Sequence, residues 1–182
     1  MSTLTVQNIQ GSSSSGNKIQ VASGHVLQAS GHILQVKQVQ FLGNYNFNDA
    51  SYQDITDLTL SITPSSTSNK ILAKCILCAS ANANQRFGVR IVRDGSMIFT
   101  PTSISSRTAA HVFGDGNGSN KPTMPSVIEL LDAPSSTSSL TYKVQAHCEA
   151  SSTLYINSTE TWSDDYTKFG AVSTLTLMEI AG

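Results

Sequence analysis

The sequence has few charged residues: Asp, Glu, Lys and Arg make up 13% of the chain, about half the share usual in soluble domains. The 11 basic and 12 acidic residues give a net charge of −1, which argues against electrostatic binding of nucleic acid because such proteins carry a basic excess. No apolar run reaches the length of a membrane span, and no basic segment followed by an apolar one opens the chain. We therefore expect neither membrane insertion nor a secretion signal.

Cysteine is also scarce, with only Cys75, Cys78 and Cys148. An odd number of cysteines without a signal peptide argues against a disulfide framework. Residues 71–78 have the composition of a strand, on which Cys75 and Cys78 face opposite ways, and no Cys/His pair follows at zinc spacing. Small buried hydrophobes are therefore a better interpretation than a zinc or redox site.

Catalytic and metal motifs are missing as well. There is no Gly-x-Ser-x-Gly turn to mark a nucleophile among the many serines. Asp115, Asn117 and Ser119 have the oxygen spacing that begins a calcium loop, but Asn120 replaces the turn glycine and Ser126 replaces the bidentate glutamate. A loop without metal is the default interpretation, and we predict no catalytic residue and no metal site.

Serine and threonine are abundant, 28 and 18 residues, and this composition favours an all-β protein. Strand-like segments alternate with turn signals from residue 33 onwards, including an Asp94-Gly95 hairpin turn. We predict a β-sandwich or jelly roll over residues 41–182. The expected strands are Ile33–Phe41, Ile55–Thr63, Lys70–Ala79, Arg86–Arg93, Ser96–Thr100, Ser126–Asp132, Leu140–Cys148, Thr153–Asn157 and Ala171–Ile180. Both faces of the last one are partly apolar, which predicts a central strand or a subunit contact.

The N-terminal part differs from the rest. No acidic residue occurs before Asp49, and the unit Ala22–Gln28 is repeated at Ala29–Gln35. Ser-Gly in each unit would weaken a helix, so we predict short extended segments punctuated by Ser-Gly turns. Segments this short cannot bury themselves in one chain, and we predict that residues 1–40 form an extended interaction arm that orders on assembly; a disordered leader is the alternative. The predicted contact residues are Ile9, Ile19, Val26, Leu27, Ile33 and Leu34.

Two further groups of side chains are candidates for binding. His25 and His32 of the repeat could form a metal-binding ring around a threefold axis, although partly exposed imidazoles bonded to backbone are the ordinary interpretation. Trp162, Tyr155 and Tyr166 could stack on a glycan or could equally cap the sandwich.

The chain resembles small virion surface proteins and fibre or tailspike tips of tailed phages, particularly those that infect cyanobacteria and other aquatic bacteria. The similar segments are Met1–Gln10, the Ser-Gly-His-Val/Ile-Leu-Gln units, Ile62–Leu72 and Leu175–Gly182. The resemblance implies a homotrimer with an intertwined N-terminal arm and a C-terminal β-sandwich, without catalysis and without a cofactor.

Length separates two roles within that group. Forty residues extend about 130 Å at most, at 3.3 Å per residue, which leaves no room for a folded fibre shaft. We therefore expect a capsid decoration (cement) protein, made in the host bacterial cytoplasm, whose arms bind the major capsid protein on the outer capsid surface by strand addition. Contact with host glycans is a secondary hypothesis. The alternative is a short tail fibre or tailspike tip that recognises a host glycan receptor.

Overall fold

The computed structural model describes residues 29–82, 85–102, 105–115, 124–150, 152–158 and 170–182. In these ranges every regular element is a strand, and no helix long and apolar enough to cross a membrane is found there. The strands are β1 (Ile33–Phe41), β2 (Tyr45–Phe47), β3 (Gln53–Ile62), β4 (Lys70–Ala81), β5 (Arg86–Arg93), β6 (Ser96–Met97), β7 (Val112–Asp115), β8 (Met124–Asp132), β9 (Leu140–Cys148), β10 (Leu154–Ile156) and β11 (Ser173–Ile180).

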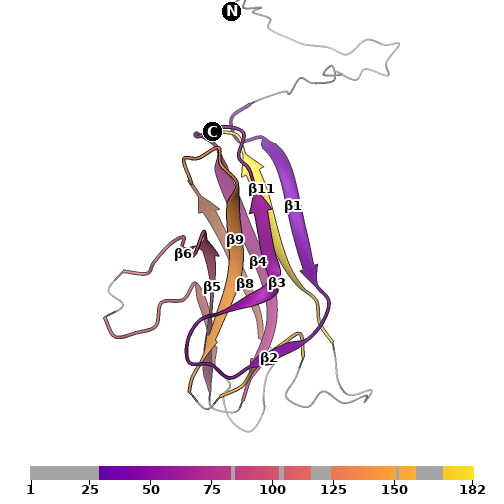
Figure 1. The fold of residues 1–182 in the computed structure, drawn as a ribbon, viewed down its shortest axis with the longest axis vertical. Coiled ribbons are helices and arrows are strands. Elements are labelled where there is room, and N and C mark those ends of the chain that lie inside the picture. The colour runs from indigo at the N-terminus through magenta and orange to yellow at the C-terminus, as the bar shows by residue number, and fades with distance from the viewer. Residues whose placement is uncertain (1–28, 83–84, 103–104, 116–123, 151, 159–169) are drawn as a thin grey trace, which may run out of the picture.

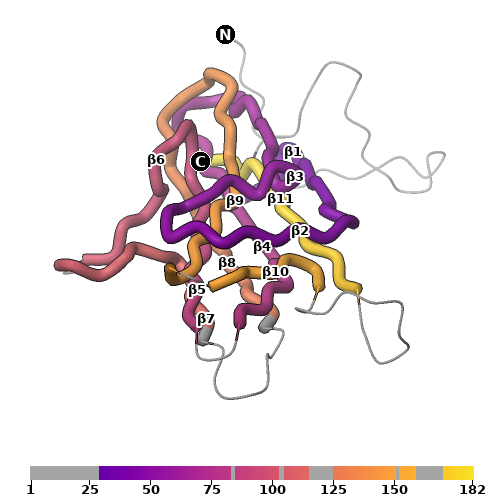
Figure 2. The backbone as a smooth tube through the Cα atoms, turned by 60° about the horizontal axis from the view of Figure 1, so that its bottom comes forward, coloured from indigo at the N-terminus to yellow at the C-terminus, as the bar shows by residue number. Residues whose placement is uncertain are grey.

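The strands form two antiparallel sheets packed face to face (Figures 1 and 2). In sheet A, the central strand β4 pairs along one edge with β11 and β10, one after the other, and along its other edge with β8. Strand β1 pairs with the far edge of β11, and β2 pairs with the far edge of β10. In sheet B the order is β3-β9-β5, with β6 and β7 on the far edge of β5. The orders β1-β11-β4-β8 and β3-β9-β5-β7 are those of a jelly roll. The predicted all-β jelly-roll sandwich is confirmed.

The core lies between the sheets and follows from alternation along the strands, which is strict in β9. In β9, Leu140, Tyr142, Val144, Ala146 and Cys148 are all buried, and every residue between them is half-buried. Each aliphatic side chain buried in this way contributes about 1.5–3 kcal/mol. Alternation therefore fixes which face of each strand points inward.

The cysteines are free, and Cys75 and Cys148 belong to this core. Burial raises the pKa of the Cys75 thiol to about 12, so the side chain stays protonated at neutral pH. The interpretation of these two residues as small hydrophobes is confirmed.

The last strand is central, which is one of the two positions that its partly apolar faces predict. β11 lies between β1 and β4, and Leu175 and Leu177 are fully buried on its inner face. Glu179 shares that inner face and is only 1% exposed.

Four hydrogen bonds satisfy the buried Glu179 carboxylate. Its Oε1 accepts from Ser65 N (2.6 Å), Ser65 Oγ (2.8 Å) and Asn69 Nδ2, and its Oε2 accepts from Gln35 Nε2 at 2.6 Å. Burial alone would raise the pKa of Glu179, but the hydrogen bonds from Gln35, Ser65 and Asn69 outweigh it and hold the pKa below its ordinary value. The carboxylate thereby ties β1 and the β3–β4 loop to β11.

A second buried carboxylate joins the two sheets. Asp132, at the end of β8, accepts hydrogen bonds from the Arg93 guanidinium and from Tyr142 Oη (2.6 Å) in sheet B. Burial and the neighbouring carboxylate raise the pKa of Tyr142, so its hydroxyl remains a donor. This contact fixes the end of β8 over β5 and β9.

The second repeat unit has the turn that the sequence predicts. Gly31 has a φ of +81°, a left-handed conformation that favours glycine, and His32 N donates to Ala29 O at 3.0 Å. Gly31 N then donates to Ala181 O, and Ala181 N donates to His32 O, both at 2.8 Å. Residues 33–40, the last part of the predicted arm, form most of β1 and pair with β11 of the same chain.

A long excursion separates β6 from β7 and projects from the sandwich (Figures 1 and 2). The predicted strand over 96–100 is shorter than expected, because β6 ends at Met97. His111 closes the base of the excursion: its Nδ1 accepts from Ile91 N (3.0 Å), which leaves Nε2–H to donate to Phe99 O (2.9 Å). The imidazole thus supplies a hydrogen-bond acceptor for the part of the β5 edge that lies between the segments paired with β7 and with β6.

This arrangement makes the excursion sensitive to acid. Burial chiefly lowers the pKa of His111 below 6.5, with a further contribution from Arg90 and an opposing one from the Phe99 carbonyl. Because its folded-state pKa is lower than the ordinary value, His111 contributes stability to the folded state above pH 6.5. This contribution is lost as the pH falls through the folded-state pKa. We expect hydrogen-exchange protection of the Ile91, Ile98 and His111 amides, corrected for intrinsic rates, to fall between pH 7 and pH 5.

The substitution His111→Phe tests the same contact. It should remove that pH dependence and should lower local stability by about 1–3 kcal/mol, because Ile91 N–H and the Phe99 carbonyl lose their partner. The matched control His147→Phe should keep the pH dependence. Equal protection of the Ile91, Ile98 and His111 amides at both pH values in the wild type would contradict the assignment.

Candidate functional site

The outer face of sheet A carries ordered rows of side chains that cross four strands. Because Ala73, Cys75 and Leu77 of β4 are buried in the core, the alternate residues of β4 and their cross-strand partners point away from it. The pairing register aligns these residues from β1 through β11 and β4 to β8. We call the first set of aligned residues the apolar row: Val36, Met178, Leu72 and Leu131.

The next two rows differ in polarity. In the polar row, Gln38 Nε2 donates to Thr176 Oγ1 at 2.7 Å, and Lys74 forms a 3.2 Å ion pair with Glu129. The third row consists, in order from β1 to β8, of Gln40, Thr174, Ile76 and Val127. The charges in the polar row cancel, and Lys70, which pairs with Ile180 on the other side of the apolar row, adds an exposed positive charge near the end of the face.

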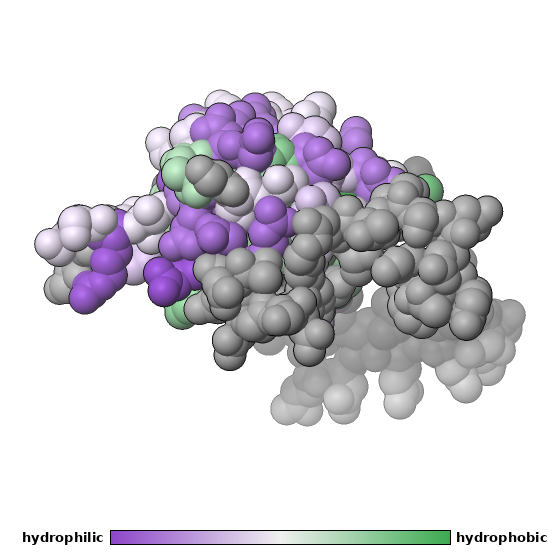
Figure 3. Space-filling view, turned by 90° about the horizontal axis from the view of Figure 1, so that it is seen from below, coloured by the Kyte–Doolittle hydropathy of each residue, from purple (hydrophilic) through white to green (hydrophobic). Residues whose placement is uncertain are grey.

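Apolar side chains on this face are unusually exposed. Val36 and Val127 are each 56% exposed, Leu131 45% and Ile76 40%. Isolated exposed hydrophobes are common, but here Val36 and Leu131 end one row and Ile76 and Val127 lie side by side in another, all on one face. By contrast, the described surface at the end of the molecule away from the C-terminus is mostly hydrophilic (Figure 3).

The predicted arm contacts are only partly described. Ile33 and Leu34 begin β1; Ile33 is exposed and Leu34 half-buried, and both adjoin the apolar row. Ile9, Ile19, Val26 and Leu27 lie outside the described residues, so their predicted role stays a prediction.

The other predicted binding residues are not brought together in the described part. Tyr155 is half-buried in β10, paired with Ser80 and Asn46, whereas Trp162 and Tyr166 lie outside the described residues. His32 is exposed beside the Gly31 turn, and His25 also lies outside. Within the described ranges, no group of three or more His, Cys, Asp or Glu side chains could hold a metal ion.

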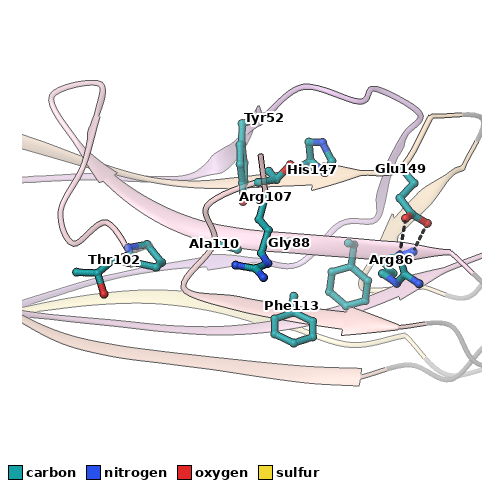
Figure 4. A pocket seen from close by; sticks show the side chains of 12 residues that line it. Tyr52, Arg86, Gly88, Thr102, Arg107, Ala110, Phe113, His147 and Glu149 are labelled. Atoms are coloured by element: carbon teal, nitrogen blue, oxygen red, sulfur yellow. Dashed lines mark hydrogen bonds and ion pairs between the residues drawn. The ribbon is translucent and has the colours of Figure 1, made fainter. Parts of the chain in front are cut away.

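A separate pocket of about 560 Å³ lies on the outer face of sheet B (Figure 4). Its floor is the cross-strand neighbours His147 and Gly88, and the excursion between β6 and β7 forms one wall. A Cβ on Gly88 would lie 3.0 Å from Tyr52 Oη and 3.1 Å from Ala110 Cβ. The absence of a side chain at Gly88 therefore leaves room for the Tyr52 side chain against this part of sheet B.

Several contacts hold the pocket's aromatic wall in place. Tyr52 Oη donates to Ala109 O at 2.6 Å, and the Arg90 guanidinium lies 3.7 Å from the centre of the Tyr52 ring. Burial raises the pKa of Tyr52 against a smaller opposing effect of Arg90, so its hydroxyl stays a donor. The His147 ring lies 5.4 Å from the same ring.

The pocket mouth is charged. Glu149 accepts from Arg86 N (3.0 Å) and forms an ion pair with Arg86 Nη1 (3.3 Å). Figure 4 shows the Arg107 side chain reaching from the excursion into the space between Tyr52 and Phe113. The Phe113 side chain lines this mouth although the residue is 75% exposed.

Sequence reasoning missed both surfaces. The outer face of sheet A had one signal, the apolar run over residues 71–79, which only Lys74 interrupts and which makes both faces of β4 apolar. The pocket residues had none, because they come from separated segments of the chain.

Comparisons with known proteins give neither a family nor a close relative. No protein-family model matches the chain, and no curated protein matches it. The chain is similar at low level to the structure of the infectious bursal disease virus Gt strain, with 13% identity and a TM-score of 0.43. It is also similar to the VP2 subviral particle of infectious bursal disease virus, with 9% identity and a TM-score of 0.38. Each comparison covers 91% of this chain but only 42% of the neighbour, so this chain spans less than half of either one. Similarity at this level assigns neither a family nor a function.

Proposed function

We propose that the protein is a non-enzymatic structural component of a virion, a homotrimer that decorates and stabilises the outer surface of a capsid. The observation that carries the proposal is the outer face of sheet A, where a row of apolar side chains without a charge crosses four strands and ends in the exposed Val36 and Leu131. A surface of this kind loses little polar hydration when another protein covers it. The phage resemblance of the sequence supplies the virion setting.

The position of the apolar row favours a closed ring of copies. The row reaches both edges of the sheet, with Val36 near one edge and Leu131 near the other. Two different patches on one chain allow the head-to-tail contact from which a cyclic trimer is built. Three copies joined in this way would bury the row without any further partner.

The arm supplies a second contact in this proposal. Among the described residues no strand pairs with the outer edge of β1, and this nine-residue edge contains no proline. The edge of β8, by contrast, contains Pro125, which cannot donate to a strand ladder. An extended segment from a sister chain or from the capsid could add to β1 by backbone hydrogen bonding.

Removing residues 1–28 tests the arm. The shortened chain keeps the Gly31 turn and β1, so we expect an unchanged unfolding temperature but loss of binding to capsids that lack the protein. Co-sedimentation with such capsids measures the binding, with the full chain as the control. Undiminished binding of the shortened chain would contradict the arm's role.

A second candidate, a short tail fibre or tailspike tip, is favoured by the pocket on sheet B. Quantitative mass spectrometry of purified virions separates the two roles. Hundreds of copies in each particle are expected for capsid decoration, and a few tens or fewer would instead place the protein in the tail.

A further inference from the structure

We propose that the open edge of β1 binds the segment Ala22–Gln28 of a second copy of this chain, as an added strand. This contact belongs to the proposed trimer and so rests on the proposed function, which does not decide between a sister chain and the capsid as the partner of that edge. Three features carry it: the direction of the backbone groups of β1, the closure of the neighbouring edge of β3, and the side from which the chain enters β1.

The backbone of β11 faces β1 at every second residue. Ala181, just beyond β11, donates its N–H to His32 O and accepts from Gly31 N, so its backbone faces the β1 side. Backbone groups point to the same edge at every second residue of a strand, and alternate residues of β11 therefore share this direction. They are Leu175, Leu177 and Glu179.

The pairing register carries this direction over to β1. The three β11 residues pair with Val39, Lys37 and Gln35, which therefore exchange hydrogen bonds with β11; we call the N–H groups of these three the ladder amides. The alternate residues of β1 point their N–H and C=O groups to the opposite edge, where the described part of the chain places no strand. Their N–H groups, which we call the edge amides, belong to the exposed residues Val36, Gln38 and Gln40.

The edge of β3, by contrast, is closed by side chains of β1. The two strands pack against each other across the side of the sandwich. Lys37 Nζ donates to Ser61 O at 3.0 Å, and Gln35 Nε2 donates to Thr63 O at 2.8 Å. Side chains that cover a strand edge in this way protect it from pairing with another chain. On this side of the sandwich, β1 is thus the edge available to a partner.

The chain's own leading segment reaches β1 from the other side. His32 N donates to Ala29 O, and Gly31 N donates to Ala181 O, so the turn lies over the end of β11 and not beside the open edge. β1 begins at the end of the sandwich where the C-terminus lies (Figure 1). A second copy can present its segment to the open edge without crossing β1, which favours a contact between copies.

The sequence of the segment suits this edge. Ala22–Gln28 repeats Ala29–Gln35, and the last three residues of the second unit already form the start of β1. The segment carries no charge, and neither do the three residues that border the open edge, so little polar hydration is lost when they meet. Val26 and Gln28 share one face of an extended chain, so the added strand can continue the apolar row and the polar row beyond β1.

Amide hydrogen exchange of the full chain, followed by NMR, tests the contact residue by residue. The edge amides should exchange about tenfold more slowly in the wild type than in the variant Val26→Pro/Leu27→Pro, because adjacent prolines remove a strand donor whichever of them faces β1. The ladder amides should be protected in both proteins. The matched control Val6→Pro/Gln7→Pro makes the same change outside the repeat and should behave as the wild type does.

Mixing separates a contact between copies from one within a chain. The variant Val26→Pro/Leu27→Pro is isotope-labelled and is allowed to assemble with an excess of unlabelled wild type. Its own segment cannot pair with β1, so slower exchange of its edge amides after mixing can come only from the segment of a sister chain. We expect mixing to restore most of the wild-type protection.

Edge amides that exchange equally fast in the wild type and in the proline variant would overturn the proposal. Protection that mixing fails to restore would overturn it too, since the chain's own segment would then cover β1. Sedimentation velocity of the same samples separates two kinds of failure. A wild-type trimer whose edge amides stay unprotected would contradict this contact alone, whereas a wild type that remains monomeric would contradict the proposed function as well.

Discussion

Replacing Glu179 by alanine should lower the free energy of unfolding by about 3 kcal/mol, the largest single-residue effect on stability that we expect. The carboxylate is buried and accepts four hydrogen bonds from Gln35, Ser65 and Asn69. Each buried donor left without a partner costs about 1–3 kcal/mol, although water that enters the space recovers part of this. For a chain of this size the unfolding temperature should fall by about 6–12 °C. Urea denaturation and differential scanning calorimetry measure both quantities.

The effect should depend on pH in a defined direction. The pKa of Glu179 lies below its ordinary value of 4.5 in the folded protein, so its contribution is present above pH 4.5 and is lost as the pH falls through the folded-state value. The wild type should lose stability over this window, and Glu179→Ala should lose correspondingly less. The two stability curves should therefore converge at low pH.

Glu129→Gln is the matched control. Glu129 is a carboxylate of the same sheet, but its ion pair with Lys74 is solvent-exposed, and such pairs contribute about 0–1 kcal/mol. A stability loss no greater in Glu179→Ala than in Glu129→Gln would show that the four hydrogen bonds to Glu179 are replaced by water without cost.

The second large effect concerns assembly. Leu131→Lys places a charge in the apolar row, where it would be buried between copies of the proposed trimer. At about 2 kcal/mol for each uncompensated polar group, three copies cost about 6 kcal/mol per trimer. This corresponds to about four orders of magnitude in the association constant. Sedimentation velocity across a dilution series should show the mass moving from about three times 19.4 kDa towards 19.4 kDa.

Because Leu131 is 45% exposed in the single chain, the substitution should leave the unfolding temperature of the dissociated chain within about 1–2 °C of the value for dilute wild type. Thr56→Lys introduces the same charge at an exposed position of β3 in sheet B and should not affect assembly. If both variants have the wild-type dissociation profile, the outer face of sheet A is not an interface.

Much of the fold could be predicted from the sequence, because strand periodicity and turn residues are local signals. The bounds of β1, β5 and β9 agree with the predicted segments, and the Asp94-Gly95 turn lies between β5 and β6 as expected. β2 and β7 were not predicted. Each is short, and each is a strand because of the neighbour it pairs with, β10 or β5, rather than through its own alternation.

The sites depend on register, which the sequence does not reveal. Val36, Leu72 and Leu131 form one row only because three strand pairings align them. The segments over 62–72 and 175–182 stood out as motifs, yet their contact through Glu179 and Ser65 depends on the same pairings. The pocket likewise joins Tyr52, Phe113 and His147 from three distant segments, so no spacing in the sequence could have indicated it.

The antiparallel pairing of β1 and β11 has a mechanical consequence. The chain reaches β1 through the Gly31 turn, which is hydrogen-bonded to Ala181 just beyond β11, so tension on residue 29 passes into the pairing of β1 with β11. Where that tension runs along the axis of β1, it strains the hydrogen bonds between β1 and β11 together, in shear, instead of opening them one after another from an end. A subunit tethered by its leading segment to an expanding shell would consequently resist detachment with the combined strength of that whole ladder.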